Sequence, residues 1–181
     1  RRNAIKEAHQ LENSIAGAHK LASWDWAYYS EKVRKEKYEI DSEALRPYFE
    51  LERVLKDGVF YAAGKLFGIS FVERPELKTY HPEARAFEVR NENGSVRGLY
   101  IADFYARPTK RGGAWMNTLV DQNELFKEKP VAVNNLNIAK PRDGEPTLLT
   151  LDETRTLFHE FGHALHRSEE HTSELQSQFR I

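Results

Sequence analysis

The sequence predicts an α+β fold, because helical patterns come first, strand patterns follow and one more helical pattern closes the series. Residues 1–67 carry apolar side chains at helical spacing. After Gly68 the apolar residues fall into short runs typical of strands. A helical pattern returns after residue 151. This order of helices, sheet and helix makes α+β the expected class.

Four helical segments are expected before Gly68. Ser23 is a candidate N-cap for the second segment, whose aromatic residues we expect to lie in the core. Pro47 ends the third segment, and Gly68 stops the fourth, since glycine is common just past a helix C-terminus. The four segments are residues 1–22, 23–39, 41–46 and 51–67. The aromatic residues of the second are Trp24, Trp26, Tyr28 and Tyr29.

Between residues 69 and 138 the sequence predicts a small antiparallel sheet. Its clearest part is a hairpin, in which residues 91–95 form a turn that contains Gly94. A short strand at residues 114–116 is expected at an edge of the sheet. The predicted strands are residues 69–73, 86–90, 96–104, 114–116 and 131–138.

The last helical pattern contains a His-Glu-x-x-His motif, which begins at His159 and ends at His163. On a helix these two histidines lie on one face, so both imidazoles can bind one metal ion. Glu160 is turned by about 100° from His159, and its carboxylate can take a proton from the attacking water. The motif therefore predicts a zinc-peptidase site with His159 and His163 as metal ligands and Glu160 as catalytic base. The alternative is a helix with two ordinary histidines and a solvated glutamate.

The surroundings of the motif favour the metal site. A polar pair on an otherwise apolar, buried helix needs partners, and a metal ion supplies them. Asp152 is the expected N-cap of this helix. The apolar residues around the histidines are Leu157, Phe158, Phe161, Ala164 and Leu165.

A zinc peptidase needs a third protein ligand, and the sequence offers none near the motif. The chain has no cysteine, so histidine and carboxylate must hold the ion. If the helix continues, Glu170 lies about 10 Å farther along the axis than His163. No Gly or Pro follows His163 to turn the chain back sharply. We therefore expect the third ligand to be absent from this chain.

Both ends of the chain are expected to be cut or altered. Residues 167–181 read like a translation of a common short-read sequencing adapter, with residues 167–177 in consecutive agreement. We therefore expect this tail to be non-native and set it aside. The N-terminus has no Met and no apolar core of a signal peptide, and no run of about 18 apolar residues follows. Whether a signal peptide has been lost stays open.

Composition narrows the function further. The remaining residues suffice for one domain or for part of a larger one. A net charge of -1 argues against nucleic acid as a partner. The absence of cysteine fits a reducing cytosol, and we expect a cytoplasmic monomer without a membrane partner.

Several strings between residues 21 and 166 resemble one family. They are Trp24-Asp25-Trp26, Leu45-Arg46-Pro47-Tyr48-Phe49, Gly58-Val59-Phe60, Tyr80-His81-Pro82, Asp103-Phe104-Tyr105-Ala106-Arg107, Arg111-Gly112-Gly113-Ala114-Trp115-Met116 and the His159 helix. In this set and order the sequence resembles the M3 family of zinc metallopeptidases, most closely its peptidyl-dipeptidase Dcp and oligopeptidase A branch.

The resemblance implies a mostly helical zincin-type fold, with the small antiparallel sheet beside the His-Glu-x-x-His helix and a narrow channel for short peptides. It implies one zinc ion on His159 and His163, with Glu160 as the catalytic glutamate. The family's third ligand, a glutamate on a later helix, has no counterpart here, nor do its downstream Tyr and His residues that stabilise the oxyanion. Residues 1–166 are thus expected to be a partial M3-type catalytic domain.

The expected function is zinc-dependent hydrolysis of short peptides, with release of dipeptides from C-termini and internal cleavage as the alternative. A further alternative is that this chain is a catalytically incompetent fragment. Gly112, Gly113 and Ala114 could offer free backbone groups to an extended substrate, or they could simply form a tight loop. His81 and His166 are expected to be structural rather than metal ligands.

Overall fold

The computed structural model describes residues 6, 22, 24–25, 28–32, 42–123 and 125–167. The chain divides into two compact units, residues 1–45 and 46–181. Within the described ranges, no helix combines the length and the apolar character needed to cross a membrane.

Only parts of the first unit are described. Residues 28–32 are helical, and α3 (Ser42–Leu45) is one helical turn. Trp24 is 82% exposed and Tyr28 is 60% exposed, so the expected core position is wrong for these two rings. Tyr29 is buried, and Tyr28 packs edge-on against it at the surface. Trp26 and most of the helices expected at residues 1–22 and 23–39 lie outside the described residues.

The second unit begins with a series of helical segments. They are the 3-10 turn η1 (Arg46–Tyr48), α4 (Leu51–Arg53), the π-helical η2 (Val54–Phe60) and α5 (Tyr61–Phe67). Glu50 caps α4, because its carboxylate accepts hydrogen bonds from the backbone N–H groups of Glu52 and Arg53. Gly68 ends α5 in the left-handed conformation, at φ 63°. The helix predicted at residues 51–67 is confirmed, and its π-helical middle is a difference from the expected regular helix.

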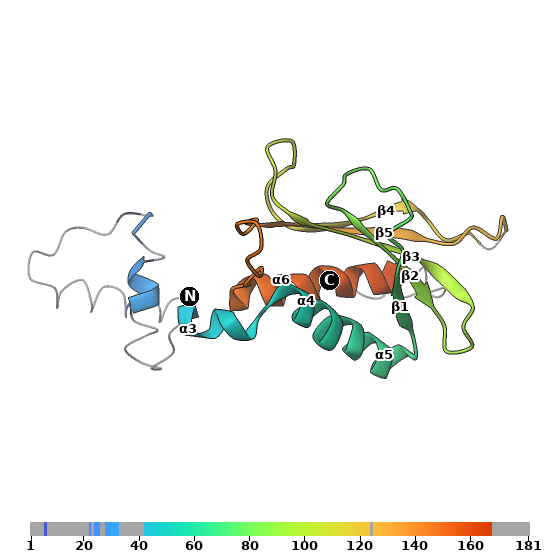
Figure 1. Ribbon diagram of the computed structural model, residues 1–181, viewed down its shortest axis with the longest axis horizontal. Coiled ribbons are helices and arrows are strands. Elements are labelled where there is room, and N and C mark those ends of the chain that lie inside the picture. Colours follow the sequence, from blue (N-terminus) through green and yellow to red (C-terminus); the bar gives the residue numbers. More distant parts are fainter. Residues whose placement is uncertain are drawn as a thin grey trace, which may run out of the picture. The chain divides into compact units, whose positions relative to one another are not determined.

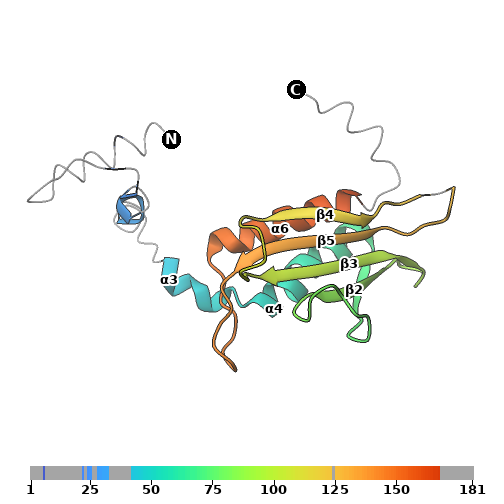
Figure 2. The same ribbon diagram turned by 90° about the horizontal axis from the view of Figure 1, so that it is seen from above.

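Five strands form one mixed sheet in the second unit (Figures 1 and 2). They are β1 (Ser70–Glu73), β2 (Arg85–Arg90), β3 (Val96–Tyr105), β4 (Trp115–Val120) and β5 (Val131–Ile138). Their order is β1-β2-β3-β5-β4, so β4 lies at an edge, as predicted. β3 and β5 run parallel, whereas the other neighbouring strands are antiparallel.

The expectation of an antiparallel sheet is therefore wrong at one pairing. After β3 the chain runs back as β4 and reverses again as β5, and β5 lies between β3 and β4. Two reversals give β5 the direction of β3. Local patterns locate the strands and the β2–β3 hairpin correctly, but they carry no information on which strand lies beside β3.

The helix α6 (Leu151–Arg167) begins with a reciprocal cap. The Thr150 hydroxyl accepts a hydrogen bond from the backbone N–H of Glu153 at 3.1 Å, and the Glu153 carboxylate accepts one from the backbone N–H of Thr150 at 2.8 Å. This is a capping box, in which Thr is followed three residues later by Glu. The prediction of Asp152 as the N-cap is wrong, because Thr150 occupies the N-cap position and Glu153 completes the capping box.

The helices of the second unit lie on one face of the sheet (Figure 1). α6 contacts β4, β5 and η2, and it buries Leu157 and Phe161. The ring of Phe161 packs edge-on against Tyr100 of β3, with 5.3 Å between ring centroids. Gly58 lets η2 approach α6 closely, since a Cβ at this position would lie 3.2 Å from the ring of Phe158. The fold is α+β, as predicted, with a five-stranded sheet and few helices in the described part, and the expected mostly helical character is not confirmed.

Candidate functional site

The two histidines of the motif lie together on α6. Their Nε2 atoms are 3.0 Å apart, and their rings are nearly perpendicular, with centroids 4.6 Å apart. Both side chains are exposed. At this distance the two nitrogens can share a proton as donor and acceptor, or both can direct lone pairs at a cation placed between them.

Glu160 has a different environment from its neighbours His159 and His163. It is 9% exposed, whereas both histidines lie at the surface. Leu157 and Phe161, on the side of α6 that faces the sheet, are buried more deeply still. The Glu160 side chain therefore leaves α6 between the buried face and the exposed histidine pair.

A hollow of about 260 Å³ lies between α6 and the start of the edge strand. α6 contributes Glu153 and Thr156 to its wall. Glu160 lies four residues after Thr156, one turn farther along the same side of the helix. Glu160 is not among the residues that line the hollow. Its remaining lining residues are Gly113, Ala114, Leu136, Asn137 and Ile138.

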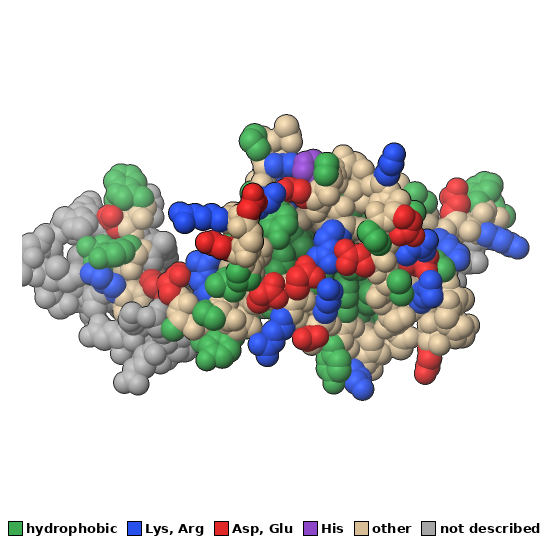
Figure 3. Space-filling model, in the orientation of Figure 1, with side chains coloured by type: hydrophobic (Ala, Val, Ile, Leu, Met, Phe, Trp, Pro, Cys, Tyr) green, Lys and Arg blue, Asp and Glu red, His purple; other side chains and the backbone are tan. Residues whose placement is uncertain are grey.

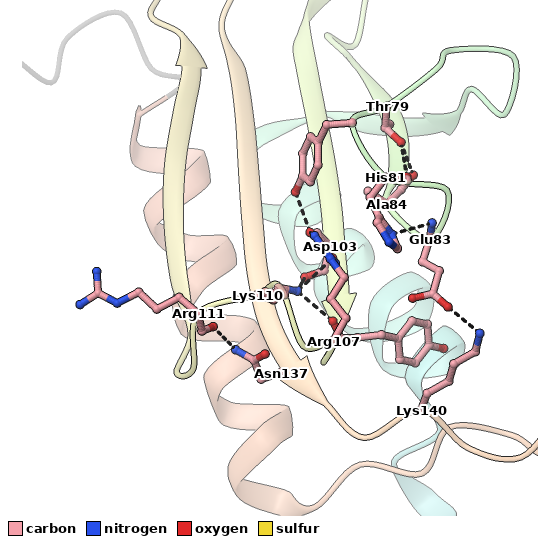
Figure 4. Close-up of polar contacts among 12 residues, drawn as sticks. Thr79, His81, Glu83, Ala84, Asp103, Arg107, Lys110, Arg111, Asn137 and Lys140 are labelled. Atoms are coloured by element: carbon pink, nitrogen blue, oxygen red, sulfur yellow. Dashed lines mark hydrogen bonds and ion pairs between the residues drawn. The ribbon is translucent and has the colours of Figure 1, made fainter.

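The glycine segment before β4 has an open surface. Gly112 and Gly113 are exposed, and a Cβ added at either position would meet no atom within 4 Å. Gly113 has φ 94°, a conformation that favours glycine. The side-chain amide of Asn137 on β5 donates hydrogen bonds to the carbonyl of Arg111 at 2.8 Å (Figure 4) and to that of Gly113 at 2.6 Å, and so holds this segment.

A buried carboxylate lies at the end of β3, close to the same loop (Figure 4). Asp103 is fully buried, and the guanidinium of Arg107 donates to both of its oxygens at 2.7 Å. The ammonium group of Lys110 donates to Asp103 Oδ1 at 2.9 Å, and the hydroxyl of Tyr80 donates to Oδ2 at 2.8 Å. This group of four residues, Asp103, Arg107, Lys110 and Tyr80, is called the Asp103 cluster below.

The Asp103 cluster changes the acidity of its members. Burial alone would raise the pKa of Asp103, but the hydrogen bonds from Arg107, Lys110 and Tyr80 lower it to about 2. Burial lowers the pKa of Lys110, and the nearby carboxylate of Asp103 opposes this effect. Burial and the hydrogen bond to Asp103 raise the pKa of the Tyr80 phenol above its usual range. Asp103 is therefore ionised at neutral pH.

Sequence patterns alone did not assign a role to the Asp103 cluster or to Asn137. The available signal was a charged residue in the apolar run Leu99–Phe104, because a buried carboxylate requires partners. Arg107 and Lys110 follow Asp103 at distances of four and seven residues and supply them. His81 takes part in a turn, where its Nδ1 accepts a hydrogen bond from the backbone N–H of Glu83.

A three-residue metal site is not assembled in the described part of the chain. Among those residues, no group of three or more His, Cys, Asp or Glu side chains is placed to hold one ion. The carboxylates after the motif, including Glu170, lie outside the described residues. The face drawn in Figure 3 carries basic and acidic side chains interspersed with apolar ones, without a broad region of one sign.

Comparison with known proteins confirms the resemblance seen in the sequence. The model of peptidase family M3 matches residues 1–179. This range extends into the tail that begins at residue 167, whose non-native origin stays a prediction. A dipeptidyl carboxypeptidase of Salmonella typhimurium is 46% identical over 169 residues, which cover 92% of this chain and 25% of that protein.

Two further relatives agree with this assignment. A dipeptidyl carboxypeptidase of Escherichia coli is 51% identical over 150 residues, covering 83% of this chain and 22% of that protein. Oligopeptidase A of Salmonella typhimurium is 45% identical over 153 residues, again covering 83% of this chain and 22% of that protein. The chain spans about a quarter of the length of these relatives. It belongs to peptidase family M3.

Proposed function

We propose that this chain carries the metal-binding and general-base part of a zinc-dependent peptidase that hydrolyses short peptides. The observation that carries the proposal is the convergence of His159 and His163, whose Nε2 atoms lie 3.0 Å apart on one helix. Family membership supports the peptidase reaction, since the relatives are named dipeptidyl carboxypeptidase and oligopeptidase A.

The geometry of the histidine pair suits zinc. Two nitrogens that bind one tetrahedral zinc ion, each at about 2.0–2.1 Å, lie about 3.3 Å apart. The observed 3.0 Å differs from this by a small side-chain rotation. Both rings are exposed, so an ion can reach them. His159 and His163 would therefore supply two ligands of one zinc ion, and a third would come from elsewhere in the complete protein.

In this proposal Glu160 acts as the general base. Zinc, when bound, supplies a Lewis acid that polarises the scissile carbonyl and lowers the pKa of water to about 7. Glu160 accepts the proton of the attacking water and passes it to the leaving amine. Its largely buried position between the histidines and the sheet limits its contact with bulk water and supports this role.

Gly112, Gly113 and Ala114 are proposed to bind the substrate backbone. They lead into β4, whose outer side has no neighbouring strand in the described sheet. An extended peptide can add to such an edge through main-chain hydrogen bonds. The two glycines are exposed and carry no side chain that would keep the peptide at a distance.

Replacing Glu160 tests the mechanism in the complete protein that contains this chain. Glu160→Gln is expected to keep bound zinc and to lower kcat by about 10²–10⁴-fold, because the base is lost while the ligands remain. Glu145→Gln, at an exposed position in the turn before α6, is the matched control and should retain full activity. Full activity in Glu160→Gln would refute its assignment as the base.

We further propose that the complete protein releases dipeptides from C-termini. The two relatives named dipeptidyl carboxypeptidase are 46% and 51% identical to this chain, compared with 45% for oligopeptidase A. Mass spectrometry of the products from an oligopeptide blocked at its C-terminus separates the two activities. Internal cleavage of that peptide would favour the oligopeptidase alternative.

The alternative proposal is that the 181-residue chain by itself is catalytically incompetent. It is favoured by the lack of a three-residue ligand group among the described residues. With two histidines as its only protein ligands, zinc is held weakly. We expect no peptide hydrolysis above background from the isolated chain. Hydrolysis that a chelator abolishes and added zinc restores would show that this alternative is wrong.

A further inference from the structure

The ion pair of Asp103 and Lys110 at the centre of the Asp103 cluster is too deeply buried to meet a substrate directly, whereas Tyr80 at its edge is 55% exposed. Asp103 has no exposed surface, and the side chain of Lys110 is 3% exposed. A buried ion pair of this kind often contributes no more stability than apolar side chains of the same volume would. The role of this ion pair therefore lies in the loops that it holds in place.

The partners of Asp103 come from loops rather than from strands. Tyr80 belongs to the connection between β1 and β2, and Arg107 and Lys110 belong to the connection between β3 and β4. Lys110 also donates to the backbone carbonyls of Asp103 at 2.7 Å and Tyr105 at 3.1 Å. One ammonium group thus joins the end of β3 to the loop that leads to the glycine segment.

The loop is held again just beyond Lys110. Asn137 binds the carbonyls of Arg111 and Gly113, as described above. Asn135, the second residue before it on β5, connects the cluster to β4. When its amide is oriented to satisfy both neighbours, it donates to Asp103 Oδ2 at 3.2 Å and accepts from the indole N–H of Trp115 at 3.2 Å. Fixed points therefore lie on both sides of Gly112.

Gly112 and Gly113 need such fixed points. Neither has a side chain that could pack, and no atom lies within 4 Å of the position of a Cβ on either residue. Glycine also loses more conformational freedom on ordering than any other residue. A peptide that binds to a freely moving segment must order it, which weakens binding. Holding the segment beforehand removes that cost.

We propose that the Asp103 cluster, together with Asn137, positions the segment Gly112–Ala114 for peptide binding. The inference rests on the proposed function, because it assumes that this segment contacts the substrate. Lys110 and Asn137 are positioning residues: they touch the loop backbone and act on the substrate through it. The structure assigns them to substrate binding rather than to the proton transfer carried out by Glu160.

The test compares two Lys→Met variants of the complete protein. Lys110→Met removes the buried ammonium group. Lys140→Met is the matched control, since Lys140 is exposed and pairs with Glu83 outside the cluster. We expect Lys110→Met to raise KM for a short peptide at least tenfold, with kcat within about twofold of the wild-type value and zinc content unchanged. The reason is that the lost interaction stabilises the bound substrate and the transition state equally. Lys140→Met should match the wild type.

Hydrogen exchange on the 181-residue chain provides a readout without catalysis. The amides of residues 111–114 should exchange at least tenfold faster in Lys110→Met, while those of α6 keep their rates. Asn137→Ala, which removes a partly exposed side chain and no buried charge, should give the same pattern if Lys110→Met does not fold. An unchanged KM and unchanged exchange in the variants would overturn the inference. A wild-type complete protein without peptidase activity would instead refute the proposed function.

Discussion

Replacing Asp103 by asparagine should destabilise the chain by an amount that can be worked out from its contacts. The cluster lowers the pKa of Asp103 from 3.8 to about 2. Each pH unit corresponds to about 1.4 kcal/mol, so the ionised form contributes about 2 kcal/mol to the free energy of unfolding at neutral pH. Leaving the buried cation of Lys110 without its partner costs about 3–5 kcal/mol in comparable cases. We expect Asp103→Asn to lower the free energy of unfolding by about 2–5 kcal/mol at pH 7.

The difference in the free energy of unfolding between the wild type and Asp103→Asn should decrease as the pH falls. Because the pKa of Asp103 is lower in the folded state, its contribution is complete above about pH 4 and is lost as the pH falls toward about 2. Urea unfolding, followed by circular dichroism at pH 7, 5, 3 and 2, measures this. The wild type and Asp103→Asn should differ at pH 7 and converge near pH 2. Asp143→Asn, at an exposed position, is the control. Equal stabilities at pH 7, or a constant difference down to pH 2, would refute the reasoning.

Two further predictions concern α6 and use the same unfolding assay. Leu157→Ala should lower the free energy of unfolding by about 2–5 kcal/mol, because the side chain is fully buried and its removal leaves a cavity. Leu151→Ala, at a position 48% exposed, should lower it by about 0.5 kcal/mol or less. Similar losses in the two variants would contradict the packing of α6. Thr150→Ala should cost about 1 kcal/mol through loss of the cap, and Asp152→Ala should cost less. The reverse order would restore Asp152 as the N-cap.

The parts of the fold that local patterns determine could be predicted from the sequence. The boundaries of β5 agree with the predicted strand at residues 131–138. Gly94 at φ 81° lies in the predicted turn, and Gly68 ends the predicted helix. In each case the signal comes from neighbours in the sequence: alternating or clustered apolar residues, or a glycine where φ is positive.

The parts that depend on distant residues could not be predicted in this way. The insertion of β5 beside β3 follows from the pairing of whole strands, and no turn residue encodes it. The contact of Tyr80 with Asp103 spans 23 positions, so neither residue indicates the other in the sequence. For the candidate site, helical spacing brings His159 and His163 together as expected. The hollow beside Thr156 is lined by residues from β5 and the glycine segment, which are distant from α6 in the sequence, so local patterns do not determine its lining.

The open side of β4 has a consequence beyond peptide binding. An unpaired edge can pair with any extended chain, including another copy of the same protein, and natural edges often carry Lys or Pro to prevent this. β4 has neither, and Leu119 on it is 56% exposed. β4 extends over Trp115–Val120, and its pairing with β5 shifts register between Thr118 and Val120. An irregularity of this kind twists and bends an edge strand, which is one of the ways in which natural sheets reduce edge-to-edge pairing.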